Sequence, residues 1–141
     1  MLRMTIKRAP GAKFLKRQRR SPIVQGLTLR KEETVKRMGA VIGVRPEKIE
    51  EYKKYHAAVW PEVLAMITRC NIRNYSIFLK DNQLFAYYEY VGKDYKADME
   101  KMARDRKTQE WWAIMKPMQK PIAARKAGEW WAEMEEVFHL D

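Results

Sequence analysis

A tyrosine and a histidine four residues apart, Tyr52 and His56, are the first candidates for chemistry in this sequence. Residues at this spacing project from the same side of a helix, one turn apart, and Trp60 extends the row by another turn. An imidazole with an ordinary pKa of about 6.5 gives and takes protons near neutral pH. The row therefore suits proton transfer, although an interior histidine with satisfied hydrogen bonds would show the same spacing.

A second aromatic group lies far downstream, where Trp111 and Trp112 are adjacent. Neighbouring helical residues diverge by about 100°, so both indoles are buried only if the helix is enclosed on two sides. A core role is expected for at least one of them. Flat aromatic faces also pack against the C–H groups of a pyranose ring, while its hydroxyls reach polar neighbours such as the phenol of Tyr75. The aromatic residues therefore also suit a monosaccharide site.

Alternating and helical spacing predicts the elements that must position these side chains. The order is strand, helix, strand, strand, helix, strand, with an additional helical piece before the last strand. Pro61 is expected to interrupt the first helix, and Asp94 and Thr108 are expected to cap the later ones. The predicted ranges are a strand at 39–44, a helix at 46–69, strands at 72–79 and 84–90, helices after 94 and after 108, and a strand at 133–140.

This order predicts an α+β, ferredoxin-like (split βαβ) fold, with a four-stranded antiparallel sheet and helices on one face. The other face of such a sheet needs a cover, and the body of the chain has no element left to supply it. We therefore expect a homodimer.

Basic residues are concentrated at the N-terminus. Residues 1–37 hold 12 Lys and Arg against two Glu, so nearly all of the formal net charge of +11 lies there. We expect residues 1–33 to be a basic N-terminal extension, disordered or bound to a partner, and residues 34–141 to form the domain. The extension has three interpretations: sequence upstream of the true start, a mitochondrial targeting segment, or an arm within residues 1–37 that binds RNA or another polyanion.

Several classes of protein are disfavoured by composition. One cysteine, Cys70, allows no intrachain disulfide and favours a reducing compartment such as the cytoplasm. His56 and His139 lie far apart without partner ligands at metal-binding spacing, so no metal site is expected. His139 is expected to have a structural or interface role. No apolar stretch is long enough to cross a membrane, and a chain of 141 residues is too short for a large multidomain enzyme.

The segment from Tyr52 to Glu62 closely resembles the Tyr-x-x-x-His-x-x-x-Trp-Pro-Glu segment of the L-rhamnose mutarotase family. Further segments are similar to those of the family in the same order, so the resemblance covers the chain from about Thr34 to Asp141. These segments are 74–79, 84–86, Trp111-Trp112 with Met115, and 135–140.

The resemblance implies a dimeric α/β barrel and an isomerase that interconverts α and β anomers of L-rhamnose or a related deoxyhexose. The reaction needs no cofactor. The resemblance also implies that His56 is the general acid of the family. Substrate contacts are implied for Tyr52, Tyr75, Trp111 and Trp112.

Two other functions compete with this one. In the first alternative, the body is a non-catalytic, mutarotase-like subunit of a larger ribonucleoprotein assembly, anchored by the basic N-terminal arm. A small oxygenase of the same fold is a weaker alternative, because the candidate pocket residues suit a sugar. The basic loop between Lys116 and Trp131 leaves the preferred sugar open.

Overall fold

The computed structural model describes residues 34–141. The predicted N-terminal extension at residues 1–33, and the polyanion contact expected of it, lie outside the described residues. The described elements are β1 (Lys36–Val44), the short 3₁₀ turn η1 (Pro46–Lys48), α1 (Ile49–Ala57), α2 (Pro61–Arg69), β2 (Ile72–Lys80), β3 (Gln83–Tyr90), α3 (Tyr95–Arg104), α4 (Arg106–Met115), η2 (Lys116–Met118), β4 (Gln119–Lys120) and β5 (Ala132–Met134).

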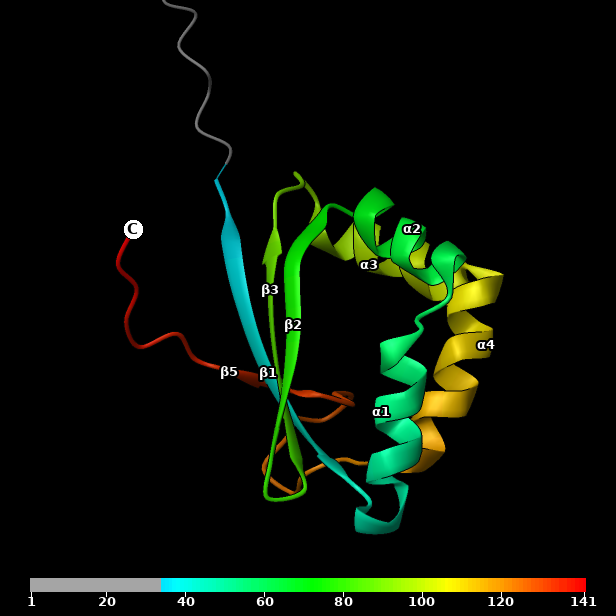
Figure 1. The fold of residues 1–141 in the computed structure, drawn as a ribbon. Coiled ribbons are helices and arrows are strands. Elements are labelled where there is room, and N and C mark those ends of the chain that lie inside the picture. Colours follow the sequence, from blue (N-terminus) through cyan, green and yellow to red (C-terminus); the bar gives the residue numbers. More distant parts are fainter. Residues whose placement is uncertain (1–33) are drawn as a thin grey trace, which may run out of the picture. The chain divides into compact units, whose positions relative to one another are not determined.

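The strands form one antiparallel sheet in the order β2-β3-β1-β4, and β5 also pairs with β1. Helices α1 to α4 lie on one side of this curved sheet (Figure 1). The ferredoxin-like α+β class is thus confirmed. Its sheet differs from the prediction in one respect, because the edge of β1 is shared between two short strands, β4 and β5, where one longer strand was expected.

Pro61 acts where the sequence predicts, and the hairpin turn lies between the two predicted strands. Pro61 begins α2 at a position where its missing N–H costs nothing, so the predicted long helix is divided into α1 and α2. The β2–β3 hairpin turns at Asp81 and Asn82, which both adopt positive φ angles of 48° and 61°. Two positive φ angles are typical of the type I′ turn that suits the twist of antiparallel strands.

The predicted cap of α4 is wrong. Asp105, and not Thr108, precedes the helix, and its carboxylate accepts hydrogen bonds from the backbone N–H of Thr108 at 2.9 Å and from its hydroxyl at 2.8 Å. A carboxylate that accepts two bonds outcompetes a hydroxyl for this position. The helix therefore starts at Arg106, and Thr108 lies buried in its first turn.

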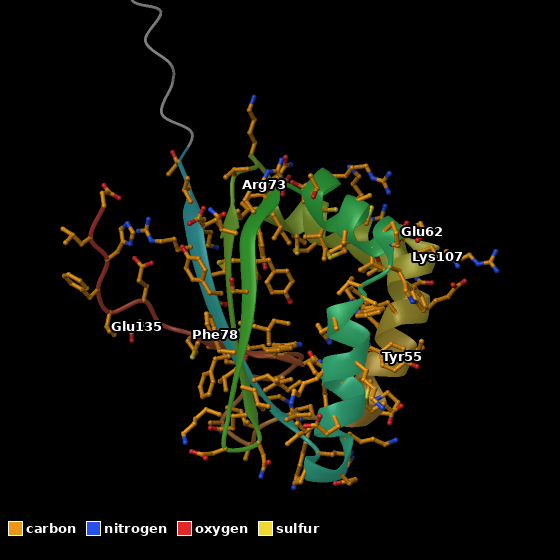
Figure 2. The ribbon with its side chains drawn as sticks, in the orientation of Figure 1. Tyr55, Glu62, Arg73, Phe78, Lys107 and Glu135 are labelled. Atoms are coloured by element: carbon orange, nitrogen blue, oxygen red, sulfur yellow. The ribbon has the colours of Figure 1, made fainter. Side chains whose placement is uncertain are left out.

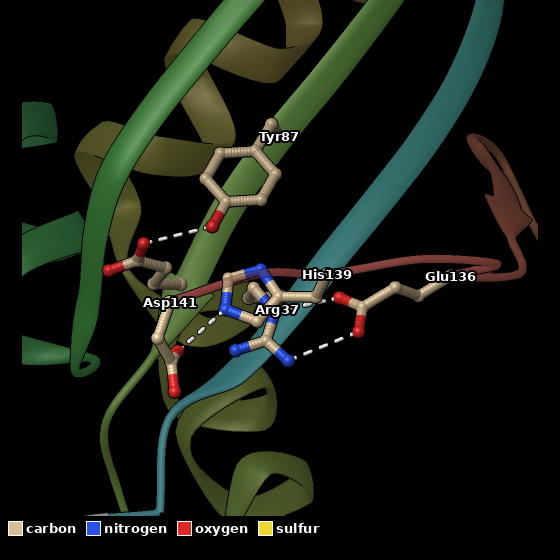
Figure 3. Close-up of polar contacts among 6 residues, drawn as sticks. Arg37, Tyr87, Glu136, His139 and Asp141 are labelled. Atoms are coloured by element: carbon tan, nitrogen blue, oxygen red, sulfur yellow. Dashed lines mark hydrogen bonds and ion pairs between the residues drawn. The ribbon is translucent and has the colours of Figure 1, made fainter.

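The last strand is shorter than expected. Only Ala132–Met134 pairs with β1, and the chain beyond it leads away from the helices (Figure 1). The side chain of Arg37 binds the carboxylate of Glu136 with two hydrogen bonds of 2.8 and 3.1 Å, next to His139 and Asp141 (Figure 3). The C-terminal segment is thus attached to β1 by a side-chain ion pair and not by strand pairing.

Strand register defines the face of the sheet that the helices cover. Residues directly opposite each other in antiparallel strands project to the same side. Ile42 pairs with Leu84, and Leu79 also pairs with Leu84, so these residues share the helix-covered face. Most of the core forms there, in a cluster of Ile42, Val44, Tyr52, Val63, Leu84, Trp111, Met115 and Met118. Cys70, fully buried, belongs to a second cluster with Met66, Ile72 and Met102.

We predict that Asp105→Ala lowers the thermal unfolding midpoint by several degrees, because the start of α4 loses its capping acceptor. Asp105→Asn, which keeps an acceptor oxygen, is the control and should lose much less. The hydrogen bonds from Thr108 lower the pKa of Asp105 below its ordinary value of 3.8. The stabilisation is therefore complete above about pH 4 and disappears as the pH falls through the lowered pKa. Equal midpoints for all three proteins at pH 7 would contradict the assignment.

Candidate active site

Helix α1 brings Tyr52 and His56 together as their spacing predicts. Their rings are stacked, with centroids 4.1 Å apart and planes inclined by 23°. Tyr52 is buried in the core cluster, while His56 is half-buried. The two side chains thus form a rigid pair on the side of α1 that faces the sheet.

The hydrogen bonding of His56 determines which of its nitrogens can react. Its Nδ1 lies 2.9 Å from the backbone carbonyl oxygen of Tyr52. A carbonyl oxygen only accepts hydrogen bonds, so Nδ1 carries the proton and Nε2 is the free nitrogen. Burial lowers the pKa of His56 below its ordinary value, and the bond to the carbonyl opposes this effect only in part. Near neutral pH the imidazole is therefore neutral, with a lone pair on Nε2.

Trp111 forms the wall behind this pair. Its ring centroid is 5.5 Å from that of His56, 5.4 Å from Trp60 and 5.9 Å from Tyr55, each in an edge-on arrangement. Only 5% of Trp111 is exposed, and the residue also belongs to the main core cluster. The α1–α4 contact, in which Tyr55 lies between the two helices (Figure 2), thus immobilises the imidazole from behind.

The two adjacent indoles diverge as the helix geometry requires. Trp112 is half-buried and packs against both core clusters. The Lys116 ammonium lies 5.7 Å from the centre of its ring and at the same distance from that of Trp130. The structure therefore brings Trp111 to His56, while Trp112 lies on another side of α4.

Tyr75 projects from β2 and is in edge-on contact with Tyr88, with ring centroids 5.4 Å apart. Although 43% of the residue is exposed, desolvation of its hydroxyl is the main cause that raises its pKa, with smaller contributions from Tyr52 and Tyr95. The hydroxyl is thus shielded from water although part of the residue is exposed. It remains protonated and can donate a hydrogen bond throughout the physiological pH range.

A cavity of about 110 Å³ lies between α1 and the sheet. Tyr52, His56 and Lys53 line it from α1, and its apolar floor consists of Val44, Ile49, Ile77, Leu79 and Leu84. Typical ligand sites have volumes of roughly 300–1,000 Å³. A ligand of ordinary size would therefore extend beyond this cavity, whose floor residues Ile77 and Leu79 belong to β2, the strand that carries Tyr75.

Sequence reasoning missed two residues of this region. Tyr88 contacts Tyr75, and its hydroxyl is 2.6 Å from that of Tyr95. The alternation of Leu84, Ala86 and Tyr88 in β3 could have placed Tyr88 on the inner face. Gln119 is buried beside the site and accepts a 2.7 Å hydrogen bond from the indole N–H of Trp130. No periodic signal identifies a residue in a strand as short as β4.

Residues 34–141 contain no group of three or more His, Cys, Asp or Glu side chains that could hold a metal ion. His139 lies in the C-terminal segment, where its Nε2 is 2.9 Å from a carboxylate oxygen of Asp141 (Figure 3). Within the described part of the chain, no helix is long and apolar enough to span a membrane.

Comparison with known proteins supports the family resemblance over most of the chain. A model of the L-rhamnose mutarotase family matches residues 37–140. Relatives named L-rhamnose mutarotase include proteins from Oceanobacillus iheyensis (38% identical over 109 residues, 76% of this chain and 100% of the relative), Listeria monocytogenes (35% over 108 residues, 75% and 99%) and Bacillus subtilis (33% over 109 residues, 76% and 100%).

A crystal structure of an L-rhamnose mutarotase from Formosa agariphila is also similar, with a TM-score of 0.58 and 23% identity over 75% of this chain and 99% of the other. At this identity the similarity concerns the fold alone. The sequence relatives, however, are matched over nearly their whole length, and the family model spans all but a few of the described residues. By both of these measures the chain belongs to the L-rhamnose mutarotase family.

Proposed function

We propose that the protein is an L-rhamnose mutarotase, an isomerase that interconverts the α and β anomers of this sugar. The observation that carries the proposal is the neutral imidazole of His56, with its free Nε2. The imidazole packs against Trp111 and lines a largely apolar cavity. The names of the relatives support L-rhamnose as the substrate.

Ring opening requires two proton transfers, and ring closure returns both protons, so the catalyst is unchanged. In ring opening, Nε2 of His56 takes the proton of the anomeric hydroxyl. The bond between the anomeric carbon and the ring oxygen breaks, and the ring oxygen receives a proton from the hydroxyl of Tyr75. The aldehyde then rotates and the transfers run backwards, so His56 returns its proton as an acid. The role of general acid that the family resemblance implies thus applies to ring closure.

We also propose Tyr52 and Tyr75 as substrate-binding residues, Trp111 as a positioning residue behind His56, and Trp112 as a further apolar contact of the site. The two tyrosines provide hydroxyl groups on opposite sides of the space between α1 and β2. Trp111 contributes through the ring of His56, which it holds, and Trp112 adds apolar surface from the next side of α4. Well-positioned acid–base groups, such as those proposed for His56 and Tyr75, contribute about 10²- to 10⁴-fold to a reaction rate.

The alternative of a non-catalytic ribonucleoprotein subunit has no support from the comparisons. The matched relatives are named as enzymes, and the basic arm required by this alternative lies outside the described residues. We propose a cytoplasmic location, in line with a single cysteine whose side chain is fully buried. The named relatives are bacterial proteins, which give the mitochondrial alternative no support.

We further propose that the protein is a homodimer joined through the face of the sheet away from the helices. Phe78 is 64% exposed on this face (Figure 2), next to the half-buried Phe85. The C-terminal segment adds Val137, which is 89% exposed, and Phe138. Apolar surface of this extent is typical of an interface between protein chains.

His56→Asn should reduce the accelerated exchange of L-rhamnose anomers by about 10²- to 10⁴-fold, because the proton acceptor is removed. Exchange spectroscopy by NMR, on the two anomeric proton signals, measures this rate directly. The matched control is His139→Asn, which changes the other histidine and should leave the rate unchanged. Full activity in His56→Asn would remove this residue from the mechanism.

The pH dependence follows from the lowered pKa of His56. Because the neutral imidazole is the active form, kcat/KM should rise with pH and reach its plateau with a midpoint below 6.5. No fall is expected until the phenols ionise, since burial raises the pKa of Tyr52 to about 12. A rate that falls as the pH rises from 5 to 8 would instead identify the imidazolium as the active form.

Phe78→Asp should convert the dimer to a monomer, because it places a charge in the centre of the proposed interface. Light scattering coupled to gel filtration gives the mass of the particle. Leu64→Asp, at an apolar residue of α2 that is 51% exposed, serves as the control and should remain dimeric. A monomeric wild-type protein would contradict the proposal.

A further inference from the structure

An irregularity in β2 lies directly beside Tyr75. The pairing of β2 with β3 shifts by one residue between Arg73 and Ser76, so two residues of β2, Asn74 and Tyr75, lie opposite Tyr88 of β3. Such a β-bulge bends its strand and redirects a side chain, and bulges are common next to active sites. Asn74 thus directly precedes the tyrosine that acts as the acid in the proposed reaction.

The backbone of Asn74 has the left-handed conformation, with a φ angle of 48°. Most side chains disfavour this conformation, and asparagine is one of the few that tolerate it. The Asn74 amide donates a 2.6 Å hydrogen bond to the carboxylate of Glu89, which also accepts a 2.9 Å bond from the hydroxyl of Tyr87. The extra residue is thus held by β3 on the face of the sheet away from the helices.

The bulge determines which side chains of β2 face the helices. Ile72 pairs with Tyr90 and Leu79 pairs with Leu84, and these two partners, six residues apart on β3, share one face. Ile72 and Leu79 are seven residues apart, so in a regular strand they would face opposite sides. With one residue inserted, Ile72 reaches the second core cluster while Leu79 lines the cavity. Tyr75, four residues before Leu79, lies on the cavity side of this insertion.

The ring of Tyr75 is supported by Tyr88. The two rings meet edge-on, with centroids 5.4 Å apart and planes inclined by 69°. Tyr88 is itself fixed by the 2.6 Å hydrogen bond between its hydroxyl and that of Tyr95. The phenol of Tyr75 therefore has a fixed neighbour, and the direction in which it leaves the strand is set by the backbone of the bulge.

We infer that Asn74 is a positioning residue, whose left-handed conformation directs the hydroxyl of Tyr75 to the ring oxygen of the bound sugar. This inference rests on the proposed mutarotase function, in which Tyr75 gives up its proton as the ring opens. A small misplacement of such a group lowers the rate of the reaction. Because the proton is transferred only in the transition state, the loss should appear in kcat and not in KM.

Asn74→Ala and Asn74→Gly together test the role of the backbone conformation. Both variants lose the amide and its bond to Glu89, but only glycine adopts a positive φ angle without a steric penalty. We expect kcat for exchange of L-rhamnose anomers to fall about tenfold in Asn74→Ala, with KM little changed. Asn74→Gly should recover most of this loss. Exchange spectroscopy by NMR over a range of sugar concentrations gives both constants.

The matched controls are Asn82→Ala and Asn82→Gly, which make the same two changes in the turn of the same hairpin, where φ is 61°. These two variants should differ in thermal unfolding midpoint but not in kcat. In a Tyr75→Phe background, the difference in kcat between alanine and glycine at position 74 should disappear, because the hydroxyl that they position is gone. Equal kcat values for Asn74→Ala and Asn74→Gly, or a difference that persists in Tyr75→Phe, would overturn the inference.

A readout independent of turnover separates this inference from the proposed function. The nuclear Overhauser effect between the ring protons of Tyr75 and Tyr88, assigned with Tyr75→Phe and Tyr88→Phe, should weaken in Asn74→Ala and persist in Asn74→Gly. An effect of the same strength in both variants would overturn the inference even if the enzyme is active. Conversely, the expected difference in a protein that does not accelerate anomer exchange would support the positioning of Tyr75 by the bulge and refute the mutarotase assignment.

Discussion

The hydrogen bond from Nδ1 of His56 to the carbonyl oxygen of Tyr52 is the interaction on which the site depends. It lies within a single turn of α1, so it needs no distant element to form. It directs the other imidazole nitrogen outwards, and burial keeps that nitrogen unprotonated near neutral pH. The remainder of the fold supports this turn, with Trp111 behind the imidazole and the sheet across from it.

The helix caps and prolines determine how this support is oriented. Pro61 ends the first helical run soon after His56, which allows α2 to take its own direction along the sheet. Asp105 fixes the first residue of α4, and thereby the angular position of Trp111 relative to α1. If Thr108 were the cap, the first turn of α4 would not form, and Trp111 would lie at the start of the helix without that turn before it. The cap of α4 thus affects the position of His56 through the contact between Trp111 and the imidazole.

Local patterns in the sequence were sufficient for most of the fold and for the centre of the site. The four-residue spacing of Tyr52 and His56 placed them on one helix side, and strand alternation placed Tyr75 on its face. Competition between neighbouring residues for the cap of a helix was harder to predict. Asp105, and not the predicted Thr108, caps α4. The burial of Gln119 had no signal in the sequence, because it depends on a two-residue strand and on a loop that returns Trp130 to it.

The apolar floor of the cavity has a consequence for the freed aldehyde. Val44, Ile77, Leu79 and Leu84 have no side-chain groups that could bind a carbonyl oxygen. On the side of this floor, the end group of a chain-form sugar can therefore turn from one face to the other with no hydrogen bond to break, and only the α1 side of the cavity offers polar groups. A lining rich in amides would bind the carbonyl oxygen in one orientation of the aldehyde and slow ring closure from the other. One pocket can therefore serve ring closure on either face of the aldehyde, and the equilibrium ratio of the two anomers stays that of the free sugar.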